Sequence, residues 1–376
     1  MRIKCPRLFA AIKNHSKHAD ALEFTQLFHS INFAHTLRVS EAELVRYDIK
    51  EGLETTHAIT PYLCRTDSRG TYLSVGVITA LFDEISTAAC ILQDKTHRPG
   101  VSVSLVVEVL ANVAPGRTLL LKTWADKLGK SLAFLRLDLR DAVTGQLVAV
   151  GKHCKMLPMA GVPFWDAAFA PFLYPFLKRP LMGLTRNHVA QGERVDWHGA
   201  ASLYDYFPLD DLVLSGNGGG VGGVDDGRDG GKVEGKATTT ASLHVQPRHC
   251  NGLFKMHGGA LAVVAEDVAV RDVAARLQSS SSSSSSSFSS SSSFSSSSSS
   301  SSAEAATAPR ARSLSMHYLQ ANSKMVDVAA WVNDAPHIKG KGGEEVPCMS
   351  LGLSSQIEVR RGGKLCNHGT ILWQEK

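Results

Sequence analysis

The chain has 376 residues, of which 43% are hydrophobic, so it is long enough for two domains that each bury a core. Its net charge of +5 comes from 40 basic and 35 acidic residues spread along the chain, without the dense basic stripe of a nucleic-acid surface, so we expect no nucleic-acid partner. The seven cysteines are scattered and include no C-x-x-C pair, which disfavours a disulfide framework and a zinc site and favours a reducing compartment.

The N-terminal segment 1–36 begins with a stretch in which several basic residues precede the first acid, Asp20. That composition is compatible with a mitochondrial presequence, and it suits equally a surface helix whose inner face carries Leu8 and Ile12. We therefore expect a helical segment or a presequence, and a location in the cytoplasm or the mitochondrial matrix. No apolar run approaches the roughly 18 residues of a membrane span, so none is expected.

A first structural unit is expected over residues 37–157. Residues 76–92 are apolar almost all round, which indicates a long helix enclosed by other elements. The runs that follow alternate apolar with polar residues and are rich in branched side chains, as antiparallel strands are. These runs are 100–110, 117–129, 131–145 and 146–157, with a hairpin turn from Asp141 to Gly145. The next segment, 158–209, is rich in aromatic residues and proline and too apolar for a free linker, so we expect it to pack along the units.

The same order of elements returns over residues 210–376. Another long apolar helix is expected over 259–277. The strand-like runs of this second unit are 210–216, 237–247, 312–319, 325–334, 349–363 and 364–373. The Gly/Asp-rich segment 216–235 and the serine tract 279–302 interrupt the unit. We expect both to be disordered, because neither can bury enough apolar surface to offset its ordering entropy.

Each unit thus combines two strands, one long helix and about four further strands, which is an α+β arrangement. Because the helix is apolar on all sides, a curved antiparallel sheet wrapped around it would enclose it. A short motif leads into the second helix: Asn251 lies six residues before the triplet His257-Gly258-Gly259, and Glu266 lies nine residues after His257.

This combination resembles the hotdog fold, and in detail the acyl-CoA thioesterases of that fold, especially the small eukaryotic type. Their pattern has an Asn six residues before an H-G-G triplet and an acid nine residues after the His. The first unit is similar to the family over longer runs, such as "FDEISTAA" and "GVSVSLVVEVL". The resemblance covers roughly 37–157 and 210–374, and it implies two tandem hotdog domains that form an intramolecular pseudo-dimer.

The first unit departs from the family pattern at the triplet. Counting nine residues back from its acid, Asp83, gives Ser74-Val75-Gly76 in place of H-G-G, and six further back Ser68 stands in place of Asn. Ser102 matches a serine that the family uses near the reacting carbonyl. The two units therefore depart from the family pattern at different positions.

Thioester hydrolysis requires donors for the carbonyl oxygen and a carboxylate that activates water or attacks directly. The start of the second helix can supply such donors, with Gly258 N–H as the candidate and His257 shaping the turn. Gly258 and Glu266 are about 12 Å apart if they lie on one helix, so they cannot serve the same carbonyl. In hotdog dimers, as the resemblance implies, the carboxylate comes from the partner protomer, which here is the other half of the chain.

We therefore expect one working site between the units. Its residues are Asp83, Ser102, Asn251, His257 and Gly258. A second, vestigial site would combine Glu266 with Ser74 and Ser68. Each of these residues also has an alternative role without a ligand. Gly258 could form a tight turn before a helix, Asn251 could sit at a turn, and Ser102 could pack in a strand, while Asp83 and Glu266 could be polar residues of their helices. His153, His249, His317 and His368 have no metal-ligand spacing, so we expect structural or surface roles for most of them.

The sequence predicts an acyl-CoA thioesterase that hydrolyses a fatty or aryl acyl-CoA to the free acid and CoA. The coenzyme A is part of the substrate, and no metal or redox cofactor is expected. Two alternatives keep the fold: a catalytically inactive acyl-CoA-binding or scaffold protein, and an enoyl-CoA hydratase-like enzyme, for which an appropriately spaced Asp and His pair is missing from the sequence. A homodimer of such two-unit chains is a further possibility, because the family forms tetramers of single hotdogs.

Overall fold

The computed structural model describes the parts of the chain that build both units. These are residues 33–39, 42–95, 98, 100–157, 200–215, 238–251, 256–283, 310–318, 325–333, 337–339, 345–347, 354–361 and 364–373. The expectations for the presequence, for most of the connecting segment, for the Gly/Asp-rich insertion and for the serine tract from residue 284 onwards lie outside the described residues.

The first unit has the expected helix followed by strands, with each boundary within a few residues of the sequence prediction. Its elements are α3 (Phe33–Thr36), β1 (Glu43–Asp48), β2 (Gly52–Ala58), η2 (Pro61–Leu63), β3 (Cys64–Asp67), β4 (Gly70–Leu73), α4 (Val75–Gln93), β5 (Val101–Val109), β6 (Thr118–Leu128), β7 (Leu132–Asp141) and β8 (Leu147–Met156). The predicted turn after β7 is present, where Gly145 has a positive φ of 73° and donates to the carbonyl of Asp141. The β3–β4 hairpin was not predicted.

The second unit repeats this order. Its elements are η3 (Leu203–Tyr206), β9 (Asp210–Ser215), β10 (Thr238–His244), η4 (Pro247–His249), α6 (Gly258–Ser283), β11 (Ala311–Tyr318), β12 (Met325–Asn333), β13 (His337–Lys339), β14 (Glu345–Pro347), β15 (Ser354–Arg361) and β16 (Lys364–Trp373). One prediction was wrong at its edge: α6 continues into the serine tract to Ser283, where disorder was expected from residue 279. Once a helix is nucleated, each added residue gains a hydrogen bond, so a helix can extend into a sequence that would not form one alone.

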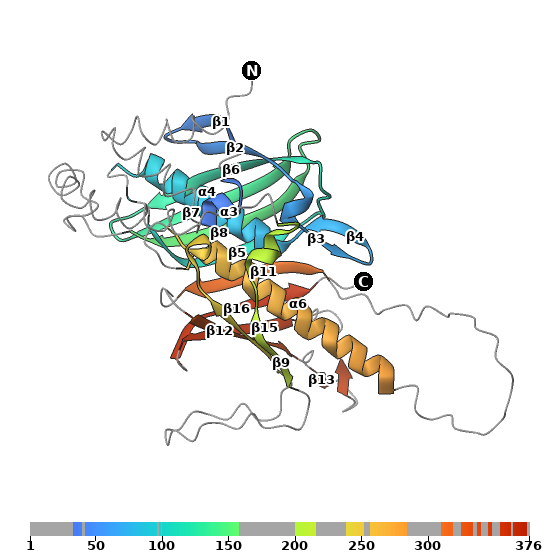
Figure 1. Ribbon diagram of the computed structural model, residues 1–376. Helices are drawn as coiled ribbons and strands as arrows, with labels where there is room; N and C mark the ends of the chain where they lie inside the picture. The colour runs from blue at the N-terminus through green and yellow to red at the C-terminus, as the bar shows by residue number, and fades with distance from the viewer. Residues whose placement is uncertain are drawn as a thin grey trace, which may run out of the picture.

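A single twelve-stranded antiparallel sheet joins the units, in the order β1-β2-β6-β7-β8-β5-β11-β16-β15-β12-β10-β9. The second half of this order repeats the first half in reverse, and the halves meet where β5 pairs with β11, with Val107 opposite Leu314. Figure 1 shows α4 with the blue and green strands in one half and α6 with the yellow, orange and red strands in the other. The arrangement therefore has an approximate two-fold relation between β5 and β11.

The sheet encloses the two helices because both are apolar on nearly every side. In α4 the side chains of Val77, Ala80 and Phe82 are fully buried, and in β7 alternate residues such as Leu135 and Leu137 face this helix. By length and composition α4 could cross a membrane, but 78% of its most apolar window is buried inside the protein. It is the central core helix of the first unit.

Glycines let α4 and α6 approach each other closely near their starts. A Cβ on Gly259 would lie 2.6 Å from Cα of Ala80, and a Cβ on Gly76 would lie 3.0 Å from the carbonyl oxygen of Ala262. Distances this short are not compatible with a side chain at either position. The first turn of each helix consequently lies against the middle of the other helix, where the acids are.

Candidate active site

Asp83 lies in the middle of α4, is 2% exposed and points toward the start of α6. Its Oδ2 accepts a hydrogen bond from Gly259 N at 2.9 Å, and its Oδ1 accepts one from Ser102 Oγ at 2.7 Å. The structure thus brings the acid and serine of the first unit to the glycine turn of the second unit. This contact joins residues more than 170 positions apart in the sequence.

His257 lies immediately before α6 and contacts two acids of the first unit. Its Nδ1 is 3.3 Å from Asp83 Oδ2, and its Nε2 is 2.9 Å from Glu84 Oε2, while its ring packs against Phe33 with centroids 5.2 Å apart. Burial lowers the pKa of His257, but the two carboxylates outweigh this effect, so the net pKa lies above the ordinary histidine value. A protonated His257 therefore fits between the two acids.

Two side chains of β8 complete the surroundings of Asp83. Lys155 Nζ lies 3.2 Å from Asp83 Oδ1 and 3.2 Å from Ser102 Oγ. His153 Nε2 lies 3.6 Å from Asp83 Oδ1, and Nδ1 of the same ring is 2.6 Å from Ser86 Oγ. Burial by itself raises the pKa of Asp83, but Lys155 and the two histidines lower it by more than burial raises it, so the net pKa is well below the ordinary range. Asp83 is a carboxylate at neutral pH.

Gly258 is the first residue of α6 and is half-buried beside this carboxylate. A Cβ at this position would lie 2.6 Å from Asp83 Oδ2 and 3.1 Å from Cζ of Tyr318, so only glycine fits without displacing them. Its carbonyl accepts a hydrogen bond from Tyr318 Oη at 3.1 Å. Backbone N–H groups in the first turn of a helix have no acceptor within the helix, which leaves them available to an anionic oxygen.

Asn251 and Ser102 are half-buried, in contrast to the enclosed Asp83. Asn251 directly follows Cys250, which forms an isolated bridge with Met256, so it lies at the base of the loop that leads into α6. Ser102 and Gly258, which both lie beside Asp83, form the more exposed side of the cluster.

Glu266 forms a second cluster at the start of α4. Its Oε2 accepts hydrogen bonds from Ser74 Oγ at 2.6 Å, Gly76 N at 3.0 Å and Tyr204 Oη at 3.2 Å. Burial raises the pKa of Glu266, an effect that its neighbours reduce but do not cancel. Ser68, which the sequence grouped with Glu266, is exposed at the turn between β3 and β4.

The strand registers show how the two clusters differ. Ser102 of β5 is paired with Lys155 of β8 directly before a bulge. At the corresponding place in the second unit, also directly before a bulge, Ala311 of β11 is paired with Trp373 of β16. At these two register positions the second unit therefore has apolar side chains in place of the hydroxyl and the ammonium, and the cation that lowers the pKa of Glu266 is Arg65 instead.

Sequence reasoning gave no role in these clusters to five residues that the structure places there: Lys155, His153, Glu84, Tyr204 and Tyr318. A signal for the first two was present, because in the alternating run of β8 they share the buried face with Ala149 and Gly151. Two ionisable residues on a core-facing register indicate a buried polar site. No comparable pattern marks Tyr204, whose position depends on how the connecting segment packs.

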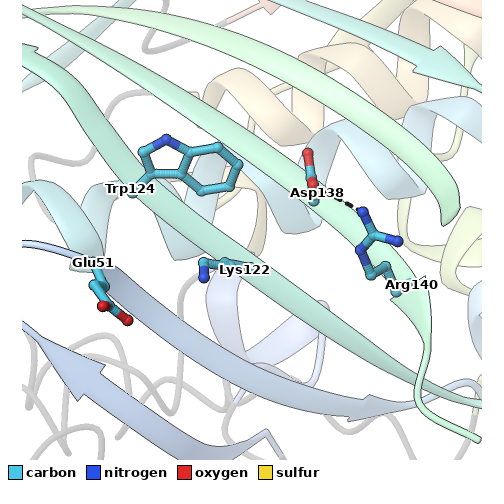
Figure 2. A pocket seen from close by; sticks show the side chains of 5 residues that line it. All are labelled: Glu51, Lys122, Trp124, Asp138 and Arg140. Carbon is cyan, nitrogen blue, oxygen red and sulfur yellow. Dashed lines mark hydrogen bonds and ion pairs between the residues drawn. The ribbon is translucent and has the colours of Figure 1, made fainter. Parts of the chain in front are cut away.

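A surface hollow of about 440 Å³ lies apart from both clusters. Glu51, Lys122, Trp124, Asp138 and Arg140 line it, and Figure 2 shows the last four on β6 and β7, with Glu51 at the turn before β2. Each of its charged side chains has an ion-pair partner: Arg140 with Asp138 at 3.4 Å, Lys122 with Glu54 at 3.3 Å and Glu51 with Arg46. This hollow has no contact with Asp83.

A sequence profile of the thioesterase superfamily matches residues 70–148, which run from β4 into β8 and contain both Asp83 and Ser102. The matched region contains α4 and most of the antiparallel strands around it. Over residues 70–148 the chain is thus similar to the thioesterase superfamily, and the expected hotdog fold of a long helix wrapped by an antiparallel sheet is confirmed.

Two curated relatives, the proteins named acyl-coenzyme A thioesterase 13 of Homo sapiens and Pongo abelii, are each 36% identical to this chain over 92 residues. The aligned part is 24% of this chain, and the chain spans 64% of the length of each relative. Among solved structures, zebra fish thioesterase superfamily member 2 is 27% identical, with coverage of 36% of this chain and 93% of that chain and a TM-score of 0.32.

Proposed function

We propose that the chain is a double-hotdog acyl-CoA thioesterase with one working site, formed between its two units. The observation that carries this proposal is the contact between Asp83 of the first unit and the turn from His257 to Gly259 of the second. Neither unit holds both the carboxylate with a low pKa and the glycine turn. The name shared by the curated relatives supports a thioester of coenzyme A as the substrate class.

In this proposal Asp83 acts on the thioester carbonyl, either by taking a proton from water or by attacking the carbon itself. The negative charge that develops on the carbonyl oxygen is stabilised by Gly258 N–H and by the dipole of α6. The carbon–sulfur bond then breaks, a carbon–oxygen bond replaces it, and the products are a carboxylic acid and the thiol of coenzyme A. Ser102 and Asn251 orient the water or the carbonyl.

The cluster around Glu266 is proposed to have no hydrolytic role. Its carboxyl has a raised pKa, so it ionises less readily than Asp83. Val75 stands where Gly258 stands in the other cluster, and the Tyr204 hydroxyl already donates to the carboxyl. One site per chain is the expected stoichiometry.

Steady-state hydrolysis of a chain-length panel of fatty and aryl acyl-CoA esters tests the proposal, with free thiol as the readout. Asp83→Asn should lower kcat by at least ~10²-fold, the usual contribution of a positioned acid or base. Glu266→Gln is the matched control and should retain most of the activity. The reverse pattern would refute the pairing of Asp83 with Gly258, and binding of acyl-CoA without turnover would indicate an inactive binding protein.

We also propose the cytoplasm or the mitochondrial matrix as the location, because the scattered cysteines suit a reducing compartment. Fractionation of cells that express the full chain tests this, and recovery in a secreted fraction would contradict it. A homodimer of two-unit chains is proposed from the family resemblance, and sedimentation of the purified chain measures its mass.

A further inference from the structure

Lys155 is one of the largest fully buried side chains of the described residues, with 1% of its surface exposed. It extends from β8 into the space between the strand and α4. A buried ammonium group is unfavourable unless it is paired with a charge and hydrogen-bonded. Here both conditions are met by groups of the proposed site, Asp83 and Ser102.

One oxygen of Asp83, the Ser102 hydroxyl and the Lys155 ammonium group are each within hydrogen-bond distance of the other two. Ser102 Oγ is 2.7 Å from Oδ1, and Lys155 Nζ is 3.2 Å from both atoms. The other oxygen, Oδ2, faces Gly259 N and the place where a Cβ of Gly258 would lie. Lys155 thus fixes the orientation of the carboxylate, with Oδ2 toward the side from which a carbonyl would approach.

The second unit serves as an internal comparison. Glu266 occupies the position in α6 that Asp83 occupies in α4, but Trp373 stands at the register position of Lys155. Glu266 has a raised pKa and Asp83 a lowered one, although both carboxyls are buried. The cation on β8 is the largest favourable influence on the Asp83 carboxylate.

We propose that Lys155 is a positioning residue that keeps Asp83 ionised and oriented and holds the Ser102 hydroxyl on Oδ1. The inference rests on the function proposed above. It predicts that the reacting acid is Asp83, which lies in the same unit as Lys155. It also predicts that activity depends on Lys155 most at the lower end of the working pH range.

Other titratable groups also face Asp83, and the experiment must separate them from Lys155. These titratable groups are His153 on the same strand, His257 before α6, and the phenol of Tyr318 on β11, of which burial keeps His153 and Tyr318 neutral through their shifted pKa values. Glu84 acts through its contact with His257. All four side chains are retained in variants of Lys155, but Lys155 also lowers the pKa of both histidines, so the double-mutant cycle with Asp83→Asn is needed to isolate its effect on Asp83.

The first measurement is the pH profile of kcat/KM for wild type, Lys155→Met and Lys155→Arg, with Lys152→Met as the control from the exposed face of the same strand. Lys155→Met should move the acid limb upward by one pH unit or more, a roughly tenfold loss below that limb. Lys155→Arg should keep the limb in place, and Lys152→Met should match wild type. A Lys155→Met enzyme with the wild-type profile would overturn the proposal.

The second measurement does not depend on activity. Denaturant unfolding of Asp83→Asn, Lys155→Met and the double variant at pH 5 and pH 8 forms a double-mutant cycle. Loss of Lys155 leaves the buried Asp83 carboxylate without its cation, so it should be destabilising at both pH values, where Asp83 is ionised, and Asp83→Asn should lessen that loss. Independent effects at both pH values would overturn the proposal. If the wild type hydrolyses no acyl-CoA ester, the proposed function fails, and this cycle alone decides the role of Lys155.

Discussion

The substitution Gly258→Ala tests the geometry of the site with a single added methyl group. The new Cβ would lie 2.6 Å from Asp83 Oδ2, whereas ordinary contacts begin at 3.4 Å. The carboxylate would therefore have to move by roughly 0.8 Å, the difference between these two distances. Asp83 cannot turn away freely, because Ser102 and Lys155 hold its other oxygen.

A misplacement of about 1 Å can lower a rate by roughly 10²-fold, so we expect a loss of that order in kcat. The hydrogen bond from Gly259 N to Oδ2 would also weaken, and a hydrogen bond to a charged group contributes about 1.5–3 kcal/mol to folding. The assay is kcat and KM for the best acyl-CoA ester, together with the free energy of unfolding.

Val75→Ala is the matched control, because Val75 stands at the equivalent place before α4, beside Glu266. It should leave kcat unchanged and lower the stability by a cavity contribution only. A Gly258→Ala protein that is folded and keeps the kcat of the wild type would refute the argument that Oδ2 faces the reacting carbonyl.

Three further predictions concern stability. Gly76→Ala would place a Cβ 2.6 Å from Glu266 Oε2 and 3.0 Å from the Ala262 carbonyl oxygen, so it should lower the unfolding free energy by about 1–3 kcal/mol in a denaturant titration; unchanged stability would contradict the close helix approach. Tyr204→Phe removes a donor to Glu266 and should lower the unfolding free energy by about 1 kcal/mol without changing kcat, and a large loss of kcat would show that this cluster takes part in hydrolysis. His257 has a raised pKa in the folded protein, so its protonation stabilises the fold fully below the ordinary value of 6.5, and this contribution is lost as the pH rises through the folded-state pKa. His257→Gln should accordingly flatten the fall of unfolding free energy between pH 6 and pH 9, and an unaltered pH dependence would refute this assignment.

Much of the fold could be predicted from local patterns. The apolar run from residue 76 to 92 has to be an enclosed helix because it has no polar face, and α4 (Val75–Gln93) agrees with it closely. Alternation of buried and exposed residues likewise indicated β5 to β8, because successive side chains of a strand point to opposite faces. Elements without such a period, such as the β3–β4 hairpin, were not predicted.

For the candidate site, the sequence by itself determined which groups are present and which pairings are impossible. The rise of a helix separates Gly258 from Glu266, so an acid on another element had to complete the site. Asp83 was the remaining acid at the matching position, and the structure places it beside the glycine turn.

Only the tertiary structure decided the surroundings of that acid. Lys155 and His153 reach the site from β8 and Glu84 from α4. The alternation of β8 marks the first two as buried, but no spacing in the sequence shows that they face Asp83 or act on its charge. The same holds for Tyr204, which contacts Glu266 through the packing of a connecting segment. The pKa of Asp83 depends on these long-range contacts, and for that reason it follows from the folded arrangement of both units and not from either unit alone.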